Sequence, residues 1–261
     1  MLKVKFDNKT ELSYSMKESL RALRTNIKFC GDDIKTILVT STVPNEGKST
    51  VTLNLARSLG ETGKNVLVID TDMRKSVLVG RLRARAENGE VLGLSHYLSG
   101  QNKLDEVLYE TEYPRLYMIF AGPAVSNPTE IIEKKYFQKL LDACKQSFDY
   151  IILDCAPLGA AIDAAVIAKK CDGAIVVVGQ GSASSRAVAN TVKQLKAADV
   201  KILGAVLNKV KMKKAGYGSY YGSYYGSYYG SYYGNYGNGN EEEMEEIVER
   251  EKEVKGVNLE E

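Results

Sequence analysis

The sequence is poor in metal-binding residues and in long apolar runs. Its four cysteines (Cys30, Cys144, Cys155 and Cys171) lack the CxxC spacing of zinc or cluster sites, and the only histidine, His96, is expected at the surface. No window approaches the ~18 apolar residues of a membrane helix, and the N-terminus lacks a secretory signal. We therefore expect a cytoplasmic protein whose contact with a membrane depends on a partner or on its surface.

The charge of the chain is small but unevenly distributed. The 261 residues suffice for one α/β domain of ordinary size and a tail, with a formal net charge of +2. From Tyr217 onward, ten acidic and three basic residues give −7, so the preceding body carries +9. A basic body favours anionic partners such as nucleotides, acidic membrane surfaces or its own modified tail.

The tail begins with a tract of tyrosine, glycine, serine and asparagine from Gly216 to Asn240. It contains ten of the seventeen tyrosines: Tyr217, Tyr220, Tyr221, Tyr224, Tyr225, Tyr228, Tyr229, Tyr232, Tyr233 and Tyr236. Ordering glycine costs backbone entropy, and serine and asparagine add no apolar area, so the tract is not expected to form a packed core. Composition alone favours a self-associating low-complexity segment. The alternative is that the hydroxyl groups are substrates presented to an active site.

Strand-like and helical segments alternate in the body. The expected strands are residues 35–41, 65–72, 115–122, 148–157, 173–180 and 201–208. The expected helices are residues 15–29, 48–63, 128–147, 160–170 and 184–198, and residues 80–112 are assigned least clearly. Because the strands are apolar on both faces and separated by helices, we expect a doubly wound, mostly parallel α/β sheet with ligands at the carboxyl ends of its strands.

The strongest motif is TVPNEGKST, residues 42–50, between an expected strand and an expected helix. Its last part matches the P-loop pattern G-x-x-x-x-G-K-[ST], although a threonine replaces the first glycine. Backbone N–H groups of a loop that opens a helix bind phosphate, Lys48 would neutralise β/γ-phosphate charge, and Ser49 would ligate Mg²⁺. The alternative is a helix that begins with GKST by chance. The expected nucleotide contacts are Thr42, Asn45, Glu46, Gly47, Lys48, Ser49 and Thr50.

Carboxylates end two of the expected strands. VLVIDTDMR ends in Asp70 and Asp72, and YIILDCAP ends in Asp154. A single strand-end aspartate would be an ordinary loop residue, but two such strand ends beside one P-loop supply what phosphoryl transfer needs. We expect Asp70 and Asp154 to hold Mg²⁺ with Ser49, and either Asp70 or Asp72 to accept a proton.

Together with the tyrosine tract, these motifs resemble those of the bacterial tyrosine kinases of capsule and exopolysaccharide assembly, specifically the separate cytoplasmic kinase of Gram-positive bacteria. That family has a Walker A motif, a DxD motif called Walker A′, a Walker B motif ending in DxxP, and a C-terminal tyrosine cluster. Asp70, Asp72 and Asp154 lie at its acidic positions and Pro157 at the Walker B proline. The resemblance implies ATP- and Mg²⁺-dependent autophosphorylation of the cluster, mainly in trans between subunits, which would regulate polysaccharide synthesis and export.

The resemblance also divides the chain and places further residues. It implies a segment 1–34 with an oligomerisation helix, a P-loop kinase domain 35–210, and a flexible linker and tyrosine cluster 211–240, followed by an acidic tail 241–261. Asn45 replaces a glycine of many family members, and the SYYG regularity and the acidic tail have no family counterpart. Asn208 would lie near the adenine, unless it is an ordinary asparagine of a strand-end turn.

Partners follow from the resemblance as well. ESLRALR fits the family's E-x2-R-x2-R element, in which Glu18, Arg21 and Arg24 would form a subunit interface in a ring, commonly of eight. Without the resemblance, these residues would be a solvated helix face with weak ion pairs. A transmembrane modulator, or polysaccharide co-polymerase, would act in trans at the inner face of the membrane. A cognate phosphotyrosine phosphatase is expected, and a nucleic-acid partner is not.

Two other functions remain open at this point. A regulatory ATPase of the partitioning or cell-division type shares the fold and transfers phosphate to water. Those proteins usually carry a second lysine early in the P-loop, where this chain has Val43, and the tyrosine tract would be unexplained. The second alternative is a non-enzymatic adaptor whose tyrosine-rich tail binds partners.

Overall fold

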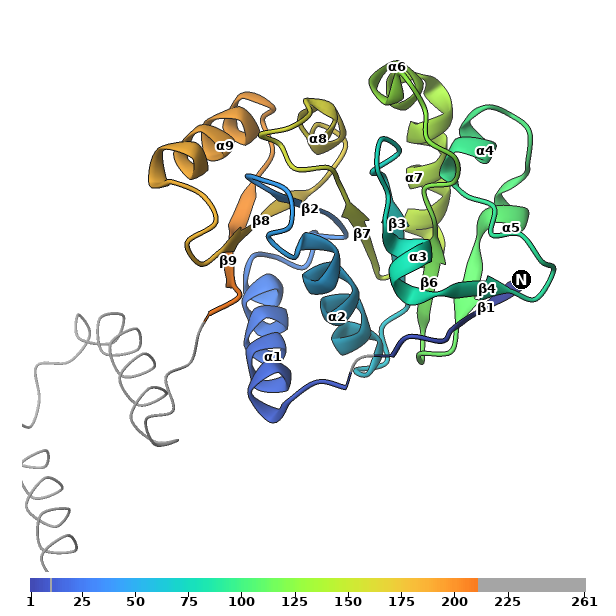
Figure 1. Ribbon diagram of the computed structural model, residues 1–261, viewed down its shortest axis with the longest axis horizontal. Helices are drawn as coiled ribbons and strands as arrows, with labels where there is room; N and C mark the ends of the chain where they lie inside the picture. The colour runs from blue at the N-terminus through green and yellow to red at the C-terminus, as the bar shows by residue number, and fades with distance from the viewer. Residues whose placement is uncertain (10, 211–261) are drawn as a thin grey trace, which may run out of the picture. The chain divides into compact units, whose positions relative to one another are not determined.

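A nine-stranded, mostly parallel sheet runs through the residues that the computed structural model describes, 1–9 and 11–210 (Figure 1). Its strand order is β4-β1-β5-β6-β3-β7-β2-β8-β9. The strands are β1 (Leu2–Phe6), β2 (Thr36–Ser41), β3 (Val66–Asp70), β4 (Ala84–Ala86), β5 (Tyr109–Thr111), β6 (Leu116–Ile119), β7 (Tyr150–Asp154), β8 (Gly173–Gly179) and β9 (Ile202–Asn208). The helices are α1 (Tyr14–Phe29), α2 (Lys48–Gly60), α3 (Leu78–Leu82), α4 (Leu94–Leu98), α5 (Leu104–Val107), α6 (Pro128–Glu133), α7 (Lys135–Ser147), α8 (Asp163–Ala168) and α9 (Ser185–Ala197). The doubly wound α/β fold expected from the sequence is confirmed.

The sheet separates two apolar cores. Leu38 of β2 faces the core formed with α4 to α9, whereas its neighbours Ile37 and Val39 face the core formed with α1, α2 and α3. Phe137 of α7 and Leu55 of α2 are fully buried in these two cores. Burial of a side chain of this size contributes about 1.5–3 kcal/mol, which explains why strands covered on both faces are continuous apolar runs.

The parallel register brings the ends of β3 and β7 to the same level. Asp70, the last residue of β3, is the register partner of Asp154, the last residue of β7. The next residue, Thr71, donates hydrogen bonds from its backbone N and from Oγ1 to the carbonyl oxygen of Asp154, each at 2.9 Å. The carboxylates predicted from the two strand ends therefore lie on one edge of the sheet.

The structure differs from the sequence-based expectation at the N-terminus. β1 pairs in parallel with β5 and antiparallel with β4, so the segment before residue 35 contributes a strand to the same sheet. The described residues up to 210 belong to one compact unit, in which the segment 1–34 is not separate from the P-loop domain. Val4 and Phe6 are buried in the core on the α1–α3 side of the sheet, whereas Lys3 and Lys5 are exposed.

The helix expected over residues 128–147 is two helices. Lys134 has extended backbone angles of φ −64° and ψ 154°, and it separates α6 from α7. The apolar periodicity continues through this break, which is why the sequence alone indicates one helix. Among the described residues, no helix has both the length and the apolarity that a membrane crossing requires.

Candidate active site

The P-loop connects β2 to α2, and a buried glutamate holds it from inside. Oε2 of Glu46 accepts hydrogen bonds from the backbone N of Thr42 at 2.7 Å and of Val43 at 2.9 Å, and Oε1 accepts one from the backbone N of Gly179 at 3.0 Å. Glu46 is fully buried. Its carboxylate therefore joins the start of the loop to the end of β8, and the nucleotide contact predicted for Glu46 stays a prediction.

Two residues of the loop have positive φ angles, 66° at Asn45 and 94° at Gly47. Asparagine tolerates this left-handed region better than most side chains do, which fits its presence where many family members have glycine. A Cβ atom at Gly47 would lie only 2.2 Å from Nδ2 of Asn208. That Nδ2 donates to the carbonyl oxygen of Glu46 at 2.9 Å, so the structure places Asn208 against the P-loop.

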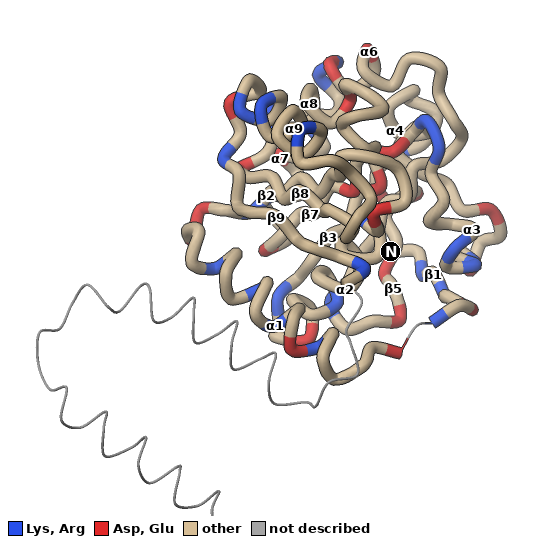
Figure 2. The backbone as a smooth tube through the Cα atoms, turned by 60° about the vertical axis from the view of Figure 1, so that its left-hand side comes forward, with Lys and Arg blue, Asp and Glu red and all other residues tan. Residues whose placement is uncertain are grey.

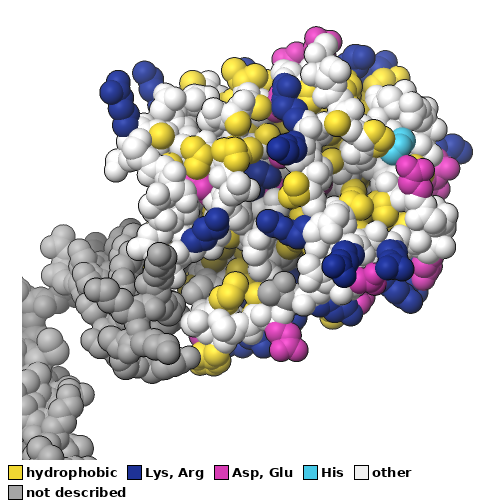
Figure 3. Space-filling view, in the orientation of Figure 1, with side chains coloured by type: hydrophobic (Ala, Val, Ile, Leu, Met, Phe, Trp, Pro, Cys, Tyr) yellow, Lys and Arg dark blue, Asp and Glu magenta, His cyan; other side chains and the backbone are white. Residues whose placement is uncertain are grey.

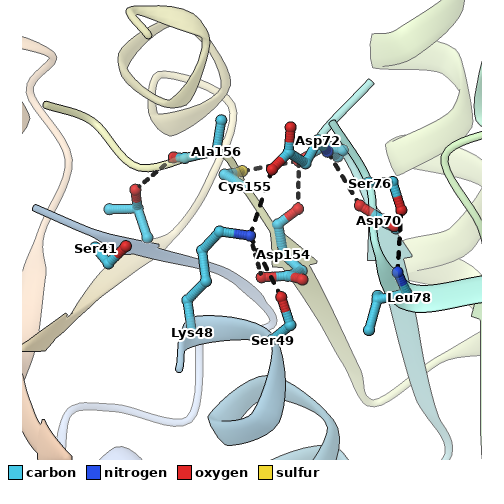
Figure 4. A network of polar contacts seen from close by, with 12 residues as sticks. Ser41, Lys48, Ser49, Asp70, Asp72, Ser76, Leu78, Asp154, Cys155 and Ala156 are labelled. Carbon is cyan, nitrogen blue, oxygen red and sulfur yellow. Dashed lines mark hydrogen bonds and ion pairs between the residues drawn. The ribbon is translucent and has the colours of Figure 1, made fainter. Parts of the chain in front are cut away.

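Lys48 and three other predicted residues converge at the carboxyl edge of the sheet (Figure 4). Nζ of Lys48 lies 3.4 Å from Oδ1 of Asp154, 3.5 Å from Oδ2 of Asp72 and 3.3 Å from Oγ of Ser49. The lysine is the first residue of α2, Asp154 ends β7, and Asp72 follows β3. The predicted lysine and strand-end carboxylates thus meet at a single point.

Burial and charge oppose each other in this centre. Burial alone would lower the pKa of Lys48, but the carboxylates of Asp154, Asp72 and Asp70 outweigh it and raise that pKa, so the lysine is charged. Burial raises the pKa of Asp70 to about 7, with a further contribution from Asp154. Burial also raises the pKa of Asp154, although Lys48 and Ser49 act in the opposite direction. Two carboxylates, those of Asp154 and Asp72, contact one ammonium group and leave excess negative charge, which suits a divalent cation.

Asp70 and Asp72 have different surroundings. Oδ1 of Asp70 accepts a hydrogen bond from the backbone N of Asp72 at 3.1 Å, and Oδ2 accepts one from the hydroxyl of Ser76. In Asp72, Oδ1 accepts from the backbone N of Lys75 at 3.1 Å, while Oδ2 faces Lys48. Both oxygens of Asp70 therefore accept hydrogen bonds from the loop that follows β3, whereas one oxygen of Asp72 is directed at Lys48. The sequence analysis missed Ser76, because a serine six residues after an aspartate carries no recognisable spacing signal.

The oxygen ligands present fit Mg²⁺. Within residues 1–9 and 11–210, no three histidine, cysteine or carboxylate side chains gather so as to hold a metal ion by themselves. Mg²⁺ is usually bound through one or two carboxylates, with substrate phosphates and waters completing its octahedron. Ser49 and Asp154, which both contact Nζ of Lys48, supply such a partial set. The remaining predicted loop residue, Thr50, is exposed, and its Oγ1 accepts a hydrogen bond from Arg81 at 3.1 Å.

The three residues expected at a subunit interface lie on α1, along which Lys and Arg residues recur (Figure 2). Glu18 and Arg21 form an ion pair with each other. Nη1 of Arg24 donates to the carbonyl oxygen of Ser58 at 2.9 Å and to its Oγ at 3.2 Å, and so it joins α1 to α2. Arg24 is thus engaged within the chain. The tyrosine cluster and the acidic tail lie outside the described residues.

The chain is similar to known proteins in sequence and in fold. A family model described as an AAA domain matches residues 34–205. Tyrosine-protein kinase CpsD of Streptococcus agalactiae is 40% identical over 214 residues, which are 82% of this chain and 92% of that protein. The kinase domain of the Escherichia coli tyrosine kinase ETK has a TM-score of 0.69 and 28% identity, covering 78% of this chain and 80% of that one.

A more distant similarity links the fold to a nucleotide complex. The septum site-determining protein MinD of Pyrococcus horikoshii, complexed with Mg-ADP, has a TM-score of 0.56 and 25% identity. It covers 69% of this chain, and the match spans 72% of that one. The tyrosine kinases are more similar than MinD is. CpsD has the higher sequence identity, the ETK kinase domain has the higher TM-score, and both cover more of this chain. With its P-loop lysine and strand-end aspartates in place, this chain belongs to the bacterial tyrosine-protein kinases.

Proposed function

We propose that this kinase transfers the γ-phosphoryl group of ATP to its own C-terminal tyrosine cluster, mainly in trans between subunits. The observation that carries the proposal is the position of Lys48 between Asp154 and Asp72 at the P-loop. The same chain ends in a tract with ten tyrosines, Tyr217 to Tyr236. A phosphoryl-transfer centre and a set of closely spaced phenols in one polypeptide supply both an enzyme and its substrate.

The phosphoryl donor is ATP bound with Mg²⁺, which the similarity to MinD in complex with Mg-ADP supports. Backbone N–H groups at the start of α2 bind the phosphates, and Lys48 neutralises charge on the β- and γ-phosphates. Ser49 and Asp154 would hold Mg²⁺, which neutralises charge developing on the transferred group. Asp70, expected from the sequence as a further Mg²⁺ ligand, is proposed instead to order the loop that carries Asp72, because both of its oxygens accept hydrogen bonds from that loop.

Asp72 is the proposed general base. The phenol has a pKa of about 10, so a carboxylate must take its proton as the phenolic oxygen attacks. A bond forms between that oxygen and the γ-phosphorus, and the bond from the phosphorus to the β–γ bridging oxygen breaks as ADP leaves. Oδ2 of Asp72 faces the centre, whereas both oxygens of Asp70 are already hydrogen-bonded, and this difference favours Asp72.

The family resemblance supports a role in capsular or exopolysaccharide synthesis. In this proposal the kinase is a homo-oligomer, a ring of eight subunits, that works at the inner face of the membrane with a membrane-spanning modulator. A cognate phosphotyrosine phosphatase reverses its modification. The adenine would lie beside Asn208, where β9 meets the P-loop.

Incubation of the full chain with ATP and Mg²⁺ tests the proposal. Mass spectrometry of phosphotyrosine should find label within residues 217–236, and a Lys48→Met chain should acquire none by itself. A heavy-isotope Lys48→Met chain mixed with unlabelled wild type should become phosphorylated, which would show transfer between molecules. Phosphate release without phosphotyrosine would instead support the regulatory ATPase, and neither product would support the adaptor.

A further inference from the structure

Arg74 makes a two-pronged ion pair that the proposed chemistry does not use. It lies two residues after Asp72, in the loop between β3 and α3, and its partner is Asp163, the first residue of α8. Nε donates to Oδ2 of Asp163, and Nη2 donates to Oδ1 at 3.0 Å. The hydroxyl of Thr129, in α6, also donates to Oδ1. Three segments far apart in the sequence therefore meet at one carboxylate.

Asp163 is a rigid partner for this arginine. Its side chain is 4% exposed, and the next residue, Ala164, is fully buried in the core beneath α8. Burial alone would raise the pKa of Asp163, but the hydrogen bonds from Arg74 and Thr129 outweigh it and keep that pKa below its usual range. Because a buried carboxylate is costly without its partners, the ionised side chain holds Arg74 in one geometry.

The segment between Asp72 and Arg74 is attached on both sides. Before Asp72, Thr71 is hydrogen-bonded to the carbonyl oxygen of Asp154. After it, Met73 is buried and its carbonyl oxygen accepts a hydrogen bond from the backbone N of Val125. In the described part of the chain, residues 71–74 form two side-chain ion pairs. One joins Asp72 to Lys48 at the P-loop, and the other joins Arg74 to Asp163 in α8. The direction of the Asp72 carboxylate therefore depends on how firmly this loop is held.

We propose that Arg74 is a positioning residue: through Asp163 it holds the loop so that Oδ2 of Asp72 faces Lys48 and the attacking phenol. The inference rests on the proposed role of Asp72 as base. The competing role is direct contact between the guanidinium and the transferred phosphate, because the Arg74 side chain is 43% exposed. The two roles differ in what removal of Asp163 does.

The test compares Arg74→Ala, Arg74→Lys, Asp163→Asn and the double variant Arg74→Ala/Asp163→Asn in the full chain. We expect Arg74→Ala and Asp163→Asn each to slow phosphotyrosine formation at saturating ATP by about 10–100-fold, the usual effect of losing a residue that supports a site without touching the substrate. The double variant should be no slower than the slower single variant, because both changes break one contact. Arg74→Lys should not restore the rate, since an ammonium group cannot form the two-pronged pair.

Binding of a fluorescent ADP analogue with Mg²⁺, and the thermal midpoint, are measured on the same samples. Affinity should change by less than about 3-fold, because the P-loop is intact and an outer contact acts on the transfer step. A purely structural role would instead lower the thermal midpoint, ADP affinity and rate together. Arg85→Ala is the matched control, because it breaks an exposed arginine–aspartate pair with Asp7 at the β1–β4 edge and should leave the rate unchanged.

A normal rate in Asp163→Asn would overturn the inference, and so would an ADP affinity that falls as far as the rate in Arg74→Ala. An additive double variant would also count against it. If wild type forms no phosphotyrosine, the proposed function fails, but the rate of ADP formation measured in parallel still tests the effect of Arg74 on the centre. Should Asp163→Asn fold poorly, Thr129→Val removes one donor to the same carboxylate and should produce a smaller loss of rate.

Discussion

At the scale of single residues, hydrogen-bond donors separate two neighbouring carboxylates that the sequence leaves equivalent. Asp70 accepts from Ser76 and from the backbone of Asp72, whereas Asp72 keeps one oxygen directed at Lys48. The pattern DxD indicates that both side chains reach the strand end, because it follows an apolar strand. It carries no information on which carboxylate faces Lys48, since that depends on the turn between β3 and α3.

Asp72→Asn tests this distinction. An amide cannot accept the phenolic proton, so phosphotyrosine formation should fall by about 10²–10⁴-fold, the usual contribution of a general base. Binding of ADP should persist because Lys48 and the loop N–H groups are unchanged. The measurement is single-turnover transfer with saturating ATP, and Asp105→Asn, at an exposed position of α5, is the control. A wild-type rate in Asp72→Asn would rule out this residue as the base.

At the scale of elements, the buried parallel strands and the longer helices could be predicted from the sequence. β2, β3 and β7 are apolar on both faces, and the P-loop motif fixes where α2 begins. The short elements between residues 78 and 111 could not be predicted from the sequence, because helices and strands of three to five residues depend on tertiary contacts rather than on periodicity. Contacts between distant segments, such as that of Arg74 with Asp163, leave no local pattern either.

Asp172 joins three elements and makes the stability of the fold depend on pH. Its Oδ2 accepts from the backbone N of Lys35 at 3.1 Å and of Thr36 at 2.7 Å, and its Oδ1 accepts from Lys145 at the end of α7 at 3.1 Å. Burial opposes ionisation, but these donors outweigh it and lower the pKa of Asp172 below its ordinary value. The ionised carboxylate therefore stabilises the folded state at neutral pH, and this contribution is lost as the pH falls through the folded-state pKa.

Asp172→Ala should lower the free energy of unfolding by about 1–3 kcal/mol at pH 7, the cost of leaving buried or charged donors unpaired. The difference from wild type should shrink as the pH falls below about 4, where the carboxyl group of the wild type becomes protonated. Urea denaturation at a series of pH values measures it. An equal difference at pH 7 and at pH 3 would contradict the assigned role.

Two adjacent aromatic residues of α7 test the packing of the core. Phe137 is fully buried against the sheet, and Tyr136 is 47% exposed. Phe137→Ala should cost about 3–5 kcal/mol of unfolding free energy, because it removes buried area and leaves a cavity. Tyr136→Ala should stay within about 0.5 kcal/mol, as surface substitutions usually do. Chemical denaturation of both variants provides the comparison, and similar losses in the two would mean that α7 is oriented differently.

At the scale of the whole molecule, charge is divided between a basic body and an acidic tail. On the face shown in Figure 3, Lys and Arg side chains are spread over the surface, with Asp and Glu among them. Each phosphate on a tyrosine adds about −1.5 to −2 charges, so ten phosphates would add about −15 to −20. Repulsion between such tails opposes any assembly that requires them to lie close together.

We therefore expect phosphorylation to dissociate the oligomer. Light scattering of the full chain should show a fall in mass after incubation with ATP and Mg²⁺, and the fall should be reduced at high salt, where charges are screened. The Lys48→Met chain, which cannot modify itself, is the control and should keep its mass. If phosphotyrosine accumulates while the mass of wild type stays constant, the tail does not act as an electrostatic switch.

The contact of Asn208 with the P-loop has a consequence for kinetics. Only eight residues lie between Asn208 and Tyr217, so the two positions are at most about 30 Å apart and each catalytic centre has a substrate tethered to it by covalent linkage. Short tethers give effective concentrations on the order of millimolar, against which a sister molecule competes. Dilution below the concentration at which the oligomer dissociates distinguishes the two routes, because the first-order rate of self-modification is then independent of protein concentration, whereas transfer between separate molecules slows in proportion to it.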